Sequence, residues 1–253
     1  MKFKMFIVLG SFMTSLLFGM SSCTKDKNGQ ADLMTANVLE VAADGTTLFV
    51  QAGLGSILQE ELSFNESELD ILMHMKEEEK LARDVYTVLY EKWGTMIFSN
   101  ISRAEETHMN AVLYLLQNYG DEYKLAGDPG VFANPDFQEL YGKLVEQGSE
   151  SIEAAFKTGA LIEDMDIKDL EEYLGVVSNE NITWVFENLL RGSRNHLRAF
   201  NRQLDRIGAT YTPVYITQEE YDEIISSPNE TGRGSRGQGQ GNGGFGNRNR
   251  NGW

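Results

Sequence analysis

The chain has 253 residues, enough for one sizeable domain with flanking segments or for two small domains. Its 22 Lys and Arg residues are outnumbered by 38 Asp and Glu residues, which gives a formal net charge of −16. A chain this acidic repels polyanions, so nucleic acid is excluded as an expected partner.

The first 22 residues, MKFKMFIVLGSFMTSLLFGMSS, have the order of an export signal, with Lys2 and Lys4 before an apolar run that ends in small residues. The run is short for a membrane span and stops at Cys23, the only cysteine. This arrangement resembles the lipobox of bacterial lipoproteins, in which the cysteine becomes the lipidated N-terminus, although Met20 stands where leucine is more usual. We therefore expect an exported, membrane-anchored lipoprotein, periplasmic or at the cell surface. An ordinary secretory signal is the alternative.

Two segments flank the expected domain. Residues 23–62 mix polar and small residues with one strand-like run, TTLFVQAG, and their glycines interrupt any long helix. We interpret them as a tether of uncertain order. Residues 226–253 consist mainly of Gly, Asn, Arg and Gln, a composition that cannot bury a core, so we expect a disordered tail.

Residues 63–225 contain four long segments with helical periodicity. The first follows a capping-box pattern, Ser63 with Glu66, and stops at Gly94. The others span about 97–119, 151–174 and 181–207. Shorter helices are expected at 136–147, within the connection between the second and third long helices, and at 216–226.

The lengths of the connections indicate a topology. Short links join the first helix to the second and the third to the fourth, whereas about thirty residues separate the second from the third. A connection this long can cross over and let helices two and three run parallel. We therefore predict an all-α fold, a ferritin-like four-helix bundle with one long crossover between helices two and three.

Each of the four helices has an apolar face that polar residues interrupt at mid-length. The interruptions are Glu79 on the first helix, Glu105 and His108 on the second, Glu163 and Asp166 on the third, and Ser193 and His196 on the fourth. A single such pair is most simply a satisfied core pair. Four interruptions at matching depth, however, place several carboxylates and two imidazoles around one point, where a cation would balance their repulsion.

These side chains approach the ligand set of di-iron carboxylate bundles, which take one Glu from each of two helices and Glu-x-x-His from each of the other two. Ser193 stands where the second Glu-x-x-His motif would have its carboxylate. Asp166, one turn after Glu163, could supply the missing oxygen; otherwise the second metal would bind weakly. Carboxylate and imidazole ligands without a thiolate suit iron or manganese, with zinc as an alternative.

The motifs EEEKLARDVYTVLYEKWG, ISRAEETHMNAVLYLLQNYG, LIEDMDIKDL and RGSRNHLRAFNRQL, in this order, resemble those of an uncharacterised ferritin-like domain family of bacterial and archaeal exported proteins. The resemblance covers about residues 63–225 and implies a ferritin-like four-helix bundle without implying an activity. The spacing of Glu79 and Tyr86 also resembles the first-helix glutamate and tyrosine of ferritins and rubrerythrins. It implies that Glu79 is a metal ligand and Tyr86 a hydrogen-bonding or redox residue beside the metal.

Two positions on the first helix are open to more than one interpretation. Three consecutive glutamates leave the helical phase uncertain by one residue, so Glu77 and Glu78 compete with Glu79, which we prefer. His74 lies one residue off the apolar face and is expected to be a solvated side chain, with a peripheral metal contact as the alternative.

The predicted function is exported metal binding at a di-iron or degenerate di-metal site, with up to two iron ions per chain between Glu79, Glu105, His108, Glu163 and His196. Such a site would react with dioxygen or peroxide, as an oxidase, ferroxidase or peroxidase, and whether the chain is an enzyme stays open. Two other hypotheses are a lipoprotein scaffold for protein binding and a zinc-dependent hydrolase. The sequence leaves the oligomeric state open, although a monomer or dimer fits a lipid-anchored chain better than a cage.

Overall fold

A computed structural model describes residues 39–41, 47–49, 64–119 and 127–230. Apart from one pair of three-residue strands, this part of the chain is helical. The predicted signal segment (1–22), the lipidated Cys23, most of the tether and residues 231–253 lie outside the described residues.

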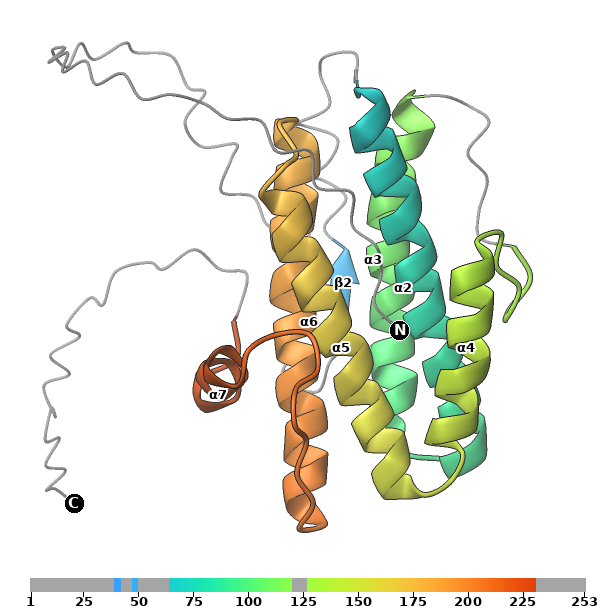
Figure 1. Cartoon of the computed structure of the whole chain (residues 1–253), viewed down its shortest axis with the longest axis vertical. Helices are drawn as coiled ribbons and strands as arrows, with labels where there is room; N and C mark the ends of the chain where they lie inside the picture. Colours follow the sequence, from blue (N-terminus) through green and yellow to red (C-terminus); the bar gives the residue numbers. More distant parts are fainter. Residues whose placement is uncertain (1–38, 42–46, 50–63, 120–126, 231–253) are drawn as a thin grey trace, which may run out of the picture. The chain divides into compact units, whose positions relative to one another are not determined.

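Four long helices make up most of the described chain (Figure 1). They are α2 (Glu66–Trp93), α3 (Met96–Tyr119), α5 (Ile152–Leu174) and α6 (Glu180–Arg206). Helix α2 packs along α3, and α5 packs along α6, while α2 also contacts α5 and α3 contacts α6. The predicted helical fold is confirmed, and the observed bounds of the second, third and fourth long helices differ from the predicted ones by one residue at most.

The shorter elements lie against these helices. Helix α4 (Pro135–Gly148) contacts α2 and α5, and α7 (Gln218–Ser226) contacts α6. Strands β1 (Leu39–Val41) and β2 (Thr47–Phe49) pair antiparallel, with Leu39 opposite Phe49. Strand β2 lies within the strand-like run predicted from the sequence, whereas β1 was not predicted.

The capping box that begins α2 differs from the predicted one. Asn65, not Ser63, is the N-cap: its side chain accepts the Glu68 N–H at 2.9 Å, and the Glu68 carboxylate accepts the Asn65 N–H at 3.1 Å. The prediction was wrong by two residues because Ser63 and Asn65 are both good cap residues with a glutamate three positions later. At the other end Gly94, with φ 65°, terminates the helix in the left-handed region, as predicted.

The core between the helices contains a group of aromatic side chains. The ring centroids of Tyr86 and Phe200 lie 5.4 Å apart, and Phe98 stacks on Phe156 at 5.7 Å. Gly159 of α5 makes this packing possible, because a Cβ there would come within 2.4 Å of the Phe200 ring. Helices α5 and α6 therefore approach closely at a residue without a side chain.

The start of the predicted tail contacts α6. The Glu230 carboxylate pairs with Arg194 at 2.5 Å and Arg198 at 2.9 Å, and its backbone N–H donates to the Asn195 side chain at 2.9 Å. Residues 227–230, which we expected to belong to the tail, are thus held on the helical domain by these polar contacts.

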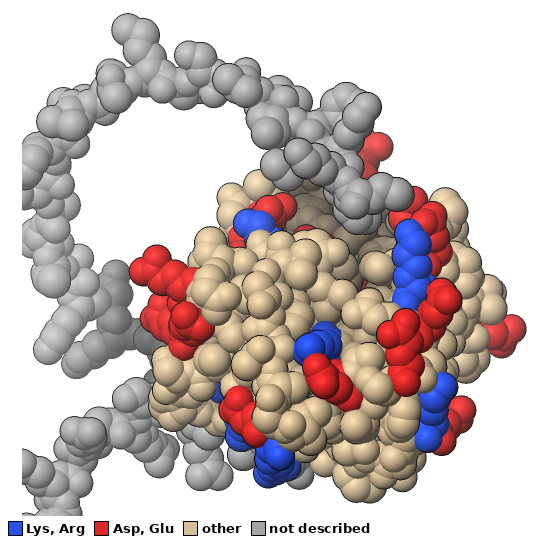
Figure 2. Space-filling view, turned by 60° about the horizontal axis from the view of Figure 1, so that its bottom comes forward, with Lys and Arg blue, Asp and Glu red and all other residues tan. Residues whose placement is uncertain are grey.

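The described surface is mixed in charge. On the face shown in Figure 2, acidic side chains form small groups, mostly near the rim, basic side chains lie next to some of them, and uncharged residues cover most of the rest. None of the helices in the described ranges combines the length and hydropathy that a membrane span requires.

Candidate metal centre

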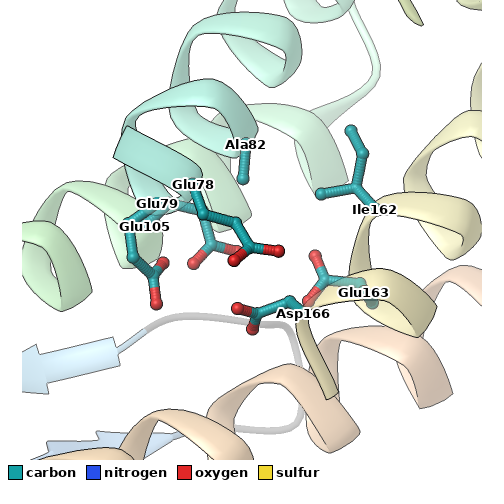
Figure 3. Close-up of a pocket in the computed structure, with 7 residues that line it drawn as sticks. All are labelled: Glu78, Glu79, Ala82, Glu105, Ile162, Glu163 and Asp166. Carbon is teal, nitrogen blue, oxygen red and sulfur yellow. The ribbon is translucent and has the colours of Figure 1, made fainter. Parts of the chain in front are cut away.

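All four long helices contribute polar side chains to one buried region, which we call the central cluster. Its members are Glu78 and Glu79 of α2, Glu105 and His108 of α3, Glu163 and Asp166 of α5, and Ser193 and His196 of α6. None of them is more than 6% exposed. The five carboxylates point toward a common space, whose lining Ala82 and Ile162 complete (Figure 3). The predicted polar interruptions of the four helices therefore meet.

The Glu105 carboxylate lies between the two histidines. Its Oε2 is 2.8 Å from Nδ1 of His108, and its Oε1 is 2.9 Å from Nδ1 of His196. The two imidazole rings face each other with centroids 5.4 Å apart and planes inclined by 22°. One carboxylate thus lies within 3 Å of both imidazoles, a position from which it could bridge two bound ions.

A further carboxylate accompanies each histidine. Glu79 Oε2 lies 3.4 Å from Nδ1 of His108, and Glu163 Oε2 lies 3.4 Å from Nδ1 of His196. Each half of the cluster therefore contains one imidazole nitrogen, one carboxylate of its own and one oxygen of Glu105.

Many of these polar atoms have no hydrogen-bond partner among the described residues. Nε2 of His108 and of His196 has no hydrogen-bond partner, and Nδ1 of each ring has only the carboxylate contacts described above. Oε1 of Glu79 and Oδ1 of Asp166 also lack a hydrogen-bond partner. Buried polar atoms are rarely left in this state, and a cation among them would satisfy several at once.

Burial changes the proton affinity of the carboxyl groups. It raises the pKa of Glu163 to about 7 and that of Asp166 to about 8. It also raises the pKa of Glu78 and Glu79 well above the usual range, and neighbouring carboxylates add to the effect. Metal binding at these groups would displace protons near neutral pH.

Glu105 and the two histidines of the cluster shift one another's pKa values in favour of their charged forms. Burial raises the pKa of Glu105, but His196 and His108 outweigh burial and hold that pKa below its usual range. Burial lowers the pKa of His196, but Glu105 and Glu163 raise it to about 10. The pKa of His108 is raised for the same reason, by Glu79 and Glu105. Glu105 is therefore the carboxylate that stays ionised most readily in this cluster.

Asp166 contacts the serine that departs from the expected ligand pattern. Ser193 Oγ donates a short hydrogen bond to Oδ2 of Asp166 and lies 3.0 Å from the Leu189 carbonyl oxygen. Asp166 Oδ1 has no partner, and the residue lines the common space. The structure thus places a carboxylate from α5 next to the position where α6 lacks one.

The structure separates the three consecutive glutamates of α2. Glu77 accepts the backbone N–H of Asn134 at 3.1 Å and does not line the common space. Glu78 and Glu79 both line it, but only Glu79 lies within 4 Å of His108. The helical period brought Glu79 to the cluster, whereas the additional participation of Glu78 was not predicted.

Tyr86 lies beside the cluster. Its hydroxyl donates to Glu163 Oε1 at 2.5 Å and is 3.3 Å from the Gly159 carbonyl oxygen. Burial, followed by the nearby carboxylates, raises the pKa of Tyr86 well above its usual value. Tyr86 is therefore a neutral donor that fixes one oxygen of Glu163.

Gly192 of α6 is a part of the site that sequence reasoning missed. A Cβ at this position would lie 2.6 Å from Cε1 and 2.7 Å from Nε2 of His108. The absence of a side chain at Gly192 is what lets the imidazole from α3 fit against α6. No periodicity within α6 signals this contact, because it depends on how two helices meet.

His74, which we expected to be solvated, is only partly exposed. The side chain is 31% exposed, its Nδ1 lies 2.9 Å from the Tyr173 hydroxyl, and its ring centroid is 4.9 Å from that of Phe137. Helix α4 supplies Phe137, so the docking of a second helix covers a residue that the pattern of α2 alone leaves outside.

The donor atoms of the central cluster fit a first-row transition metal. One ligand atom each from Glu105, His108 and His196 lies within 4.8 Å of the others. Imidazole and carboxylate together suit iron, manganese and zinc, and the single cysteine lies outside the described residues. The chain is therefore a helical protein with a buried cluster of carboxylates and histidines that could hold a metal ion.

Comparison with known proteins gives the family. Residues 68–228 match the family described as "Uncharacterized protein domain (DUF2202)", and the chain belongs to this family. The matched range includes the whole central cluster. The chain is also similar to the "Uncharacterized protein MJ0754" of Methanocaldococcus jannaschii, with 55% identity over 169 residues, which is 66% of this chain and 91% of that protein. The crystal structure of hypothetical protein MJ0754 from Methanococcus jannaschii aligns with a TM-score of 0.66 and 53% identity, over 68% of this chain and 98% of that chain.

Proposed function

We propose that this protein is a ferritin-like metalloprotein that binds two divalent metal ions, iron in the first place, in its central cluster and reacts with dioxygen or peroxide. The observation that carries the proposal is the position of Glu105. One of its oxygens faces each histidine, at 2.8 and 2.9 Å, and both oxygens belong to one carboxylate that can bridge two ions.

The arrangement of the helices supports a ferritin-like bundle. Helices α2 and α3 pack as one pair and α5 and α6 as another, with contacts between the pairs. The connection between α3 and α5 includes helix α4 and is long enough to cross over the bundle. Four helices then surround one buried site, as such a fold requires.

The two halves of the cluster suggest an assignment of ligands. His108 and Glu79 would hold one ion, His196 and Glu163 would hold the other, and Glu105 would serve both. Asp166, fixed through one oxygen by Ser193, offers its free Oδ1 where a sixth ligand is missing. The serine therefore weakens the site less than its position in the motif indicates.

Two bound ferrous ions would supply the two electrons that reduce peroxide to water. The protein's own residues prepare the site for this chemistry. Burial of the cluster at 6% exposure or less excludes bulk water, and the Tyr86 hydroxyl holds Glu163 in one orientation. Manganese or zinc would fit the same donors, so metal identity has to be measured.

Export and lipid attachment remain proposals that rest on residues 1–23. Replacement of the predicted lipidated residue, Cys23→Ser, should move the protein from the membrane fraction to the soluble fraction of cells. Equal membrane association of wild type and variant would favour another means of attachment.

The test is an anaerobic titration of the purified full chain with Fe(II). We expect about two irons per chain, followed by a ferric absorbance in the near ultraviolet when peroxide or air is admitted. Glu105→Gln and His108→Ala should lose both the iron and the absorbance. Glu106→Gln, which removes an exposed carboxylate next to Glu105, is the matched control and should behave as wild type.

Other results would favour the other hypotheses. Failure of the wild type to bind any transition metal stoichiometrically would remove the proposal. If His108→Leu and His196→Leu then stabilised the protein, the buried polar residues would have no metal to bind, and the protein-binding scaffold would be favoured. Tight zinc without an oxygen-dependent absorbance would favour the hydrolase.

A further inference from the structure

A second group of possible ligands lies next to the central cluster. It consists of His74 and Glu78 of α2 and Asp169 of α5, which each offer one ligand atom within 4.8 Å of the others. Nδ1 of His74 is 3.7 Å from Oε2 of Glu78. The proposed central site does not use His74 or Asp169.

The buried carboxyl group of Glu78, which lacks hydrogen-bond partners, indicates that this group of residues binds a ligand. Its side chain is 2% exposed, and neither carboxylate oxygen has a hydrogen-bond partner among the described residues. A buried carboxyl group without a hydrogen-bond partner is costly, and a cation bound close to it would offset that cost. The same side chain also lines the common space of the central cluster (Figure 3), so it faces both groups of ligands.

His74 is positioned by its neighbours. The Tyr173 hydroxyl is 2.9 Å from its Nδ1, and the Phe137 ring packs against the imidazole at 4.9 Å. The nitrogen that faces Glu78 is this same Nδ1, so a bound metal would take the place of the Tyr173 hydroxyl there. Its side chain is 31% exposed, in contrast to 0% for His108 and His196.

We propose that His74, Glu78 and Asp169 form an outer binding site for a divalent transition-metal cation, and that Glu78 passes ions from this site to the central cluster. The outer site stands on its own ligands, whereas the transfer role rests on the proposed function. The combination of one imidazole and two carboxylates selects first-row cations over magnesium or calcium, which prefer oxygen ligands alone.

The order of residues along α2 supports the direction of transfer. His74 is partly exposed, Glu78 follows one turn later and is buried, and Glu79 is in contact range of His108. An ion that binds first at the partly exposed imidazole therefore meets the buried carboxylates of Glu78 and Glu79 before it reaches the central histidines.

The experiment uses cobalt(II) alone, added to the metal-free full chain. Equilibrium dialysis gives the number of cobalt ions per chain, and stopped-flow visible absorbance gives the rate at which they bind. The variants are His74→Phe, which keeps a ring against Phe137, and Asp169→Asn. The control is Glu172→Gln, which removes an exposed carboxylate of the same helix that pairs only with Lys168 among its described ion pairs.

We expect His74→Phe and Asp169→Asn each to bind one cobalt fewer than wild type and to fill the remaining sites roughly tenfold more slowly. Glu172→Gln should match wild type in both. Loss of one cobalt without a change in rate would support the outer site and overturn the transfer role. If both variants bind cobalt in the same number and at the same rate as wild type, the outer site is overturned.

Glu105→Gln separates this inference from the proposed function. If it binds as many cobalt ions as wild type, the central site fails, while the outer site is still decided by the difference between wild type and His74→Phe.

Discussion

The backbone of Gly192 lies directly against the imidazole of His108, so that a Cβ on the glycine would come within 2.6 Å of the ring. The contact joins α6 to the proposed ligand of α3, whose side chain is fully buried. It makes the geometry of the central cluster sensitive to one methyl group.

Gly192→Ala should therefore displace His108 and weaken metal binding. Overpacking of this kind costs roughly 1–3 kcal/mol of unfolding free energy, and a displaced ligand should lower metal affinity by about tenfold or more. Competition with a chelator of known affinity measures the second effect, and urea unfolding measures the first.

Gly142→Ala is the control for this substitution. Gly142 is an exposed residue within α4, and no atom lies within 4 Å of where its Cβ would be. Alanine there should stabilise the helix by up to ~1 kcal/mol without an effect on metal. If Gly192→Ala binds metal as tightly as wild type, His108 is not held where the ligand assignment needs it.

Lys80 and Asp84 form a buried ion pair at 2.5 Å, each with 3% of its side chain exposed. Lys80 also donates to the Asp128 carbonyl at 3.0 Å and lies 4.2 Å from the Phe132 ring centroid, so it anchors the segment before α4. Lys80→Met should lower the unfolding free energy by about 1–3 kcal/mol, because Asp84 loses one charged partner while Arg83 still pairs with it at 2.7 Å.

Urea unfolding followed by circular dichroism tests this prediction. Lys157→Met breaks an exposed pair with Glu153 in the same i, i+4 arrangement and should change stability little. Equal effects of the two substitutions would show that burial of the Lys80 pair contributes nothing.

The sequence predicted which polar side chains meet in the core wherever the helical period alone decides their position. Glu105 and His108 are three residues apart on a face whose apolar members are all buried, and a helix has no other way to orient them. The same argument brought Glu163 and His196 to the cluster. These predictions needed only the periodicity of each helix and the matching depth of the four interruptions.

Features that depend on contacts between elements were not predictable in this way. Gly192 matters because of a side chain on another helix, and His74 is covered by Phe137 of α4. Glu77, Glu78 and Glu79 are the same residue type in sequence. Only the packed structure shows that Glu78 lines the common space together with residues of α5. Such relations become visible once the helices are placed in space.

Glu68 links the start of α2 to the loop before α6. Oε1 of Glu68 accepts the N–H groups of Ser178 and Asn179 and the Ser178 hydroxyl, each at 3.0 Å. Burial raises the pKa of Glu68, but these hydrogen bonds and that of Asn65 outweigh it and lower the pKa below its usual value. Because the folded pKa is the lower one, the ionised group stabilises the fold above the unfolded-state pKa, and this contribution is lost as the pH falls through the folded value.

Glu68→Gln should thus be less stable than wild type near neutral pH, and the difference should shrink as the pH is lowered below about 4.5. Urea unfolding at a series of pH values measures it. Glu66→Gln removes an exposed carboxylate from the same turn and controls for the loss of charge. A difference between wild type and Glu68→Gln that stays constant down to acid pH would contradict the linkage.

The Tyr86 hydroxyl is the described donor to Oε1 of Glu163, and it contacts neither histidine. Tyr86→Phe should therefore keep the number of bound metal ions, because no ligand is removed. The metal-free protein should lose about 1–3 kcal/mol of unfolding free energy, since Glu163 keeps its burial but loses its donor. The reaction of the iron-loaded protein with peroxide should slow by roughly 10- to 100-fold, because Glu163 is no longer fixed in one orientation.

Tyr90→Phe, which removes a more exposed hydroxyl of the same helix, should change none of these quantities. Iron counts, urea unfolding and stopped-flow absorbance distinguish the possible roles of Tyr86. A loss of iron in Tyr86→Phe would mean that the hydroxyl is needed to assemble the site. An unchanged reaction rate would mean that the metal alone holds Glu163 in position. Tyr86 would then be a core residue whose hydrogen bond to Glu163 has no effect on the reaction.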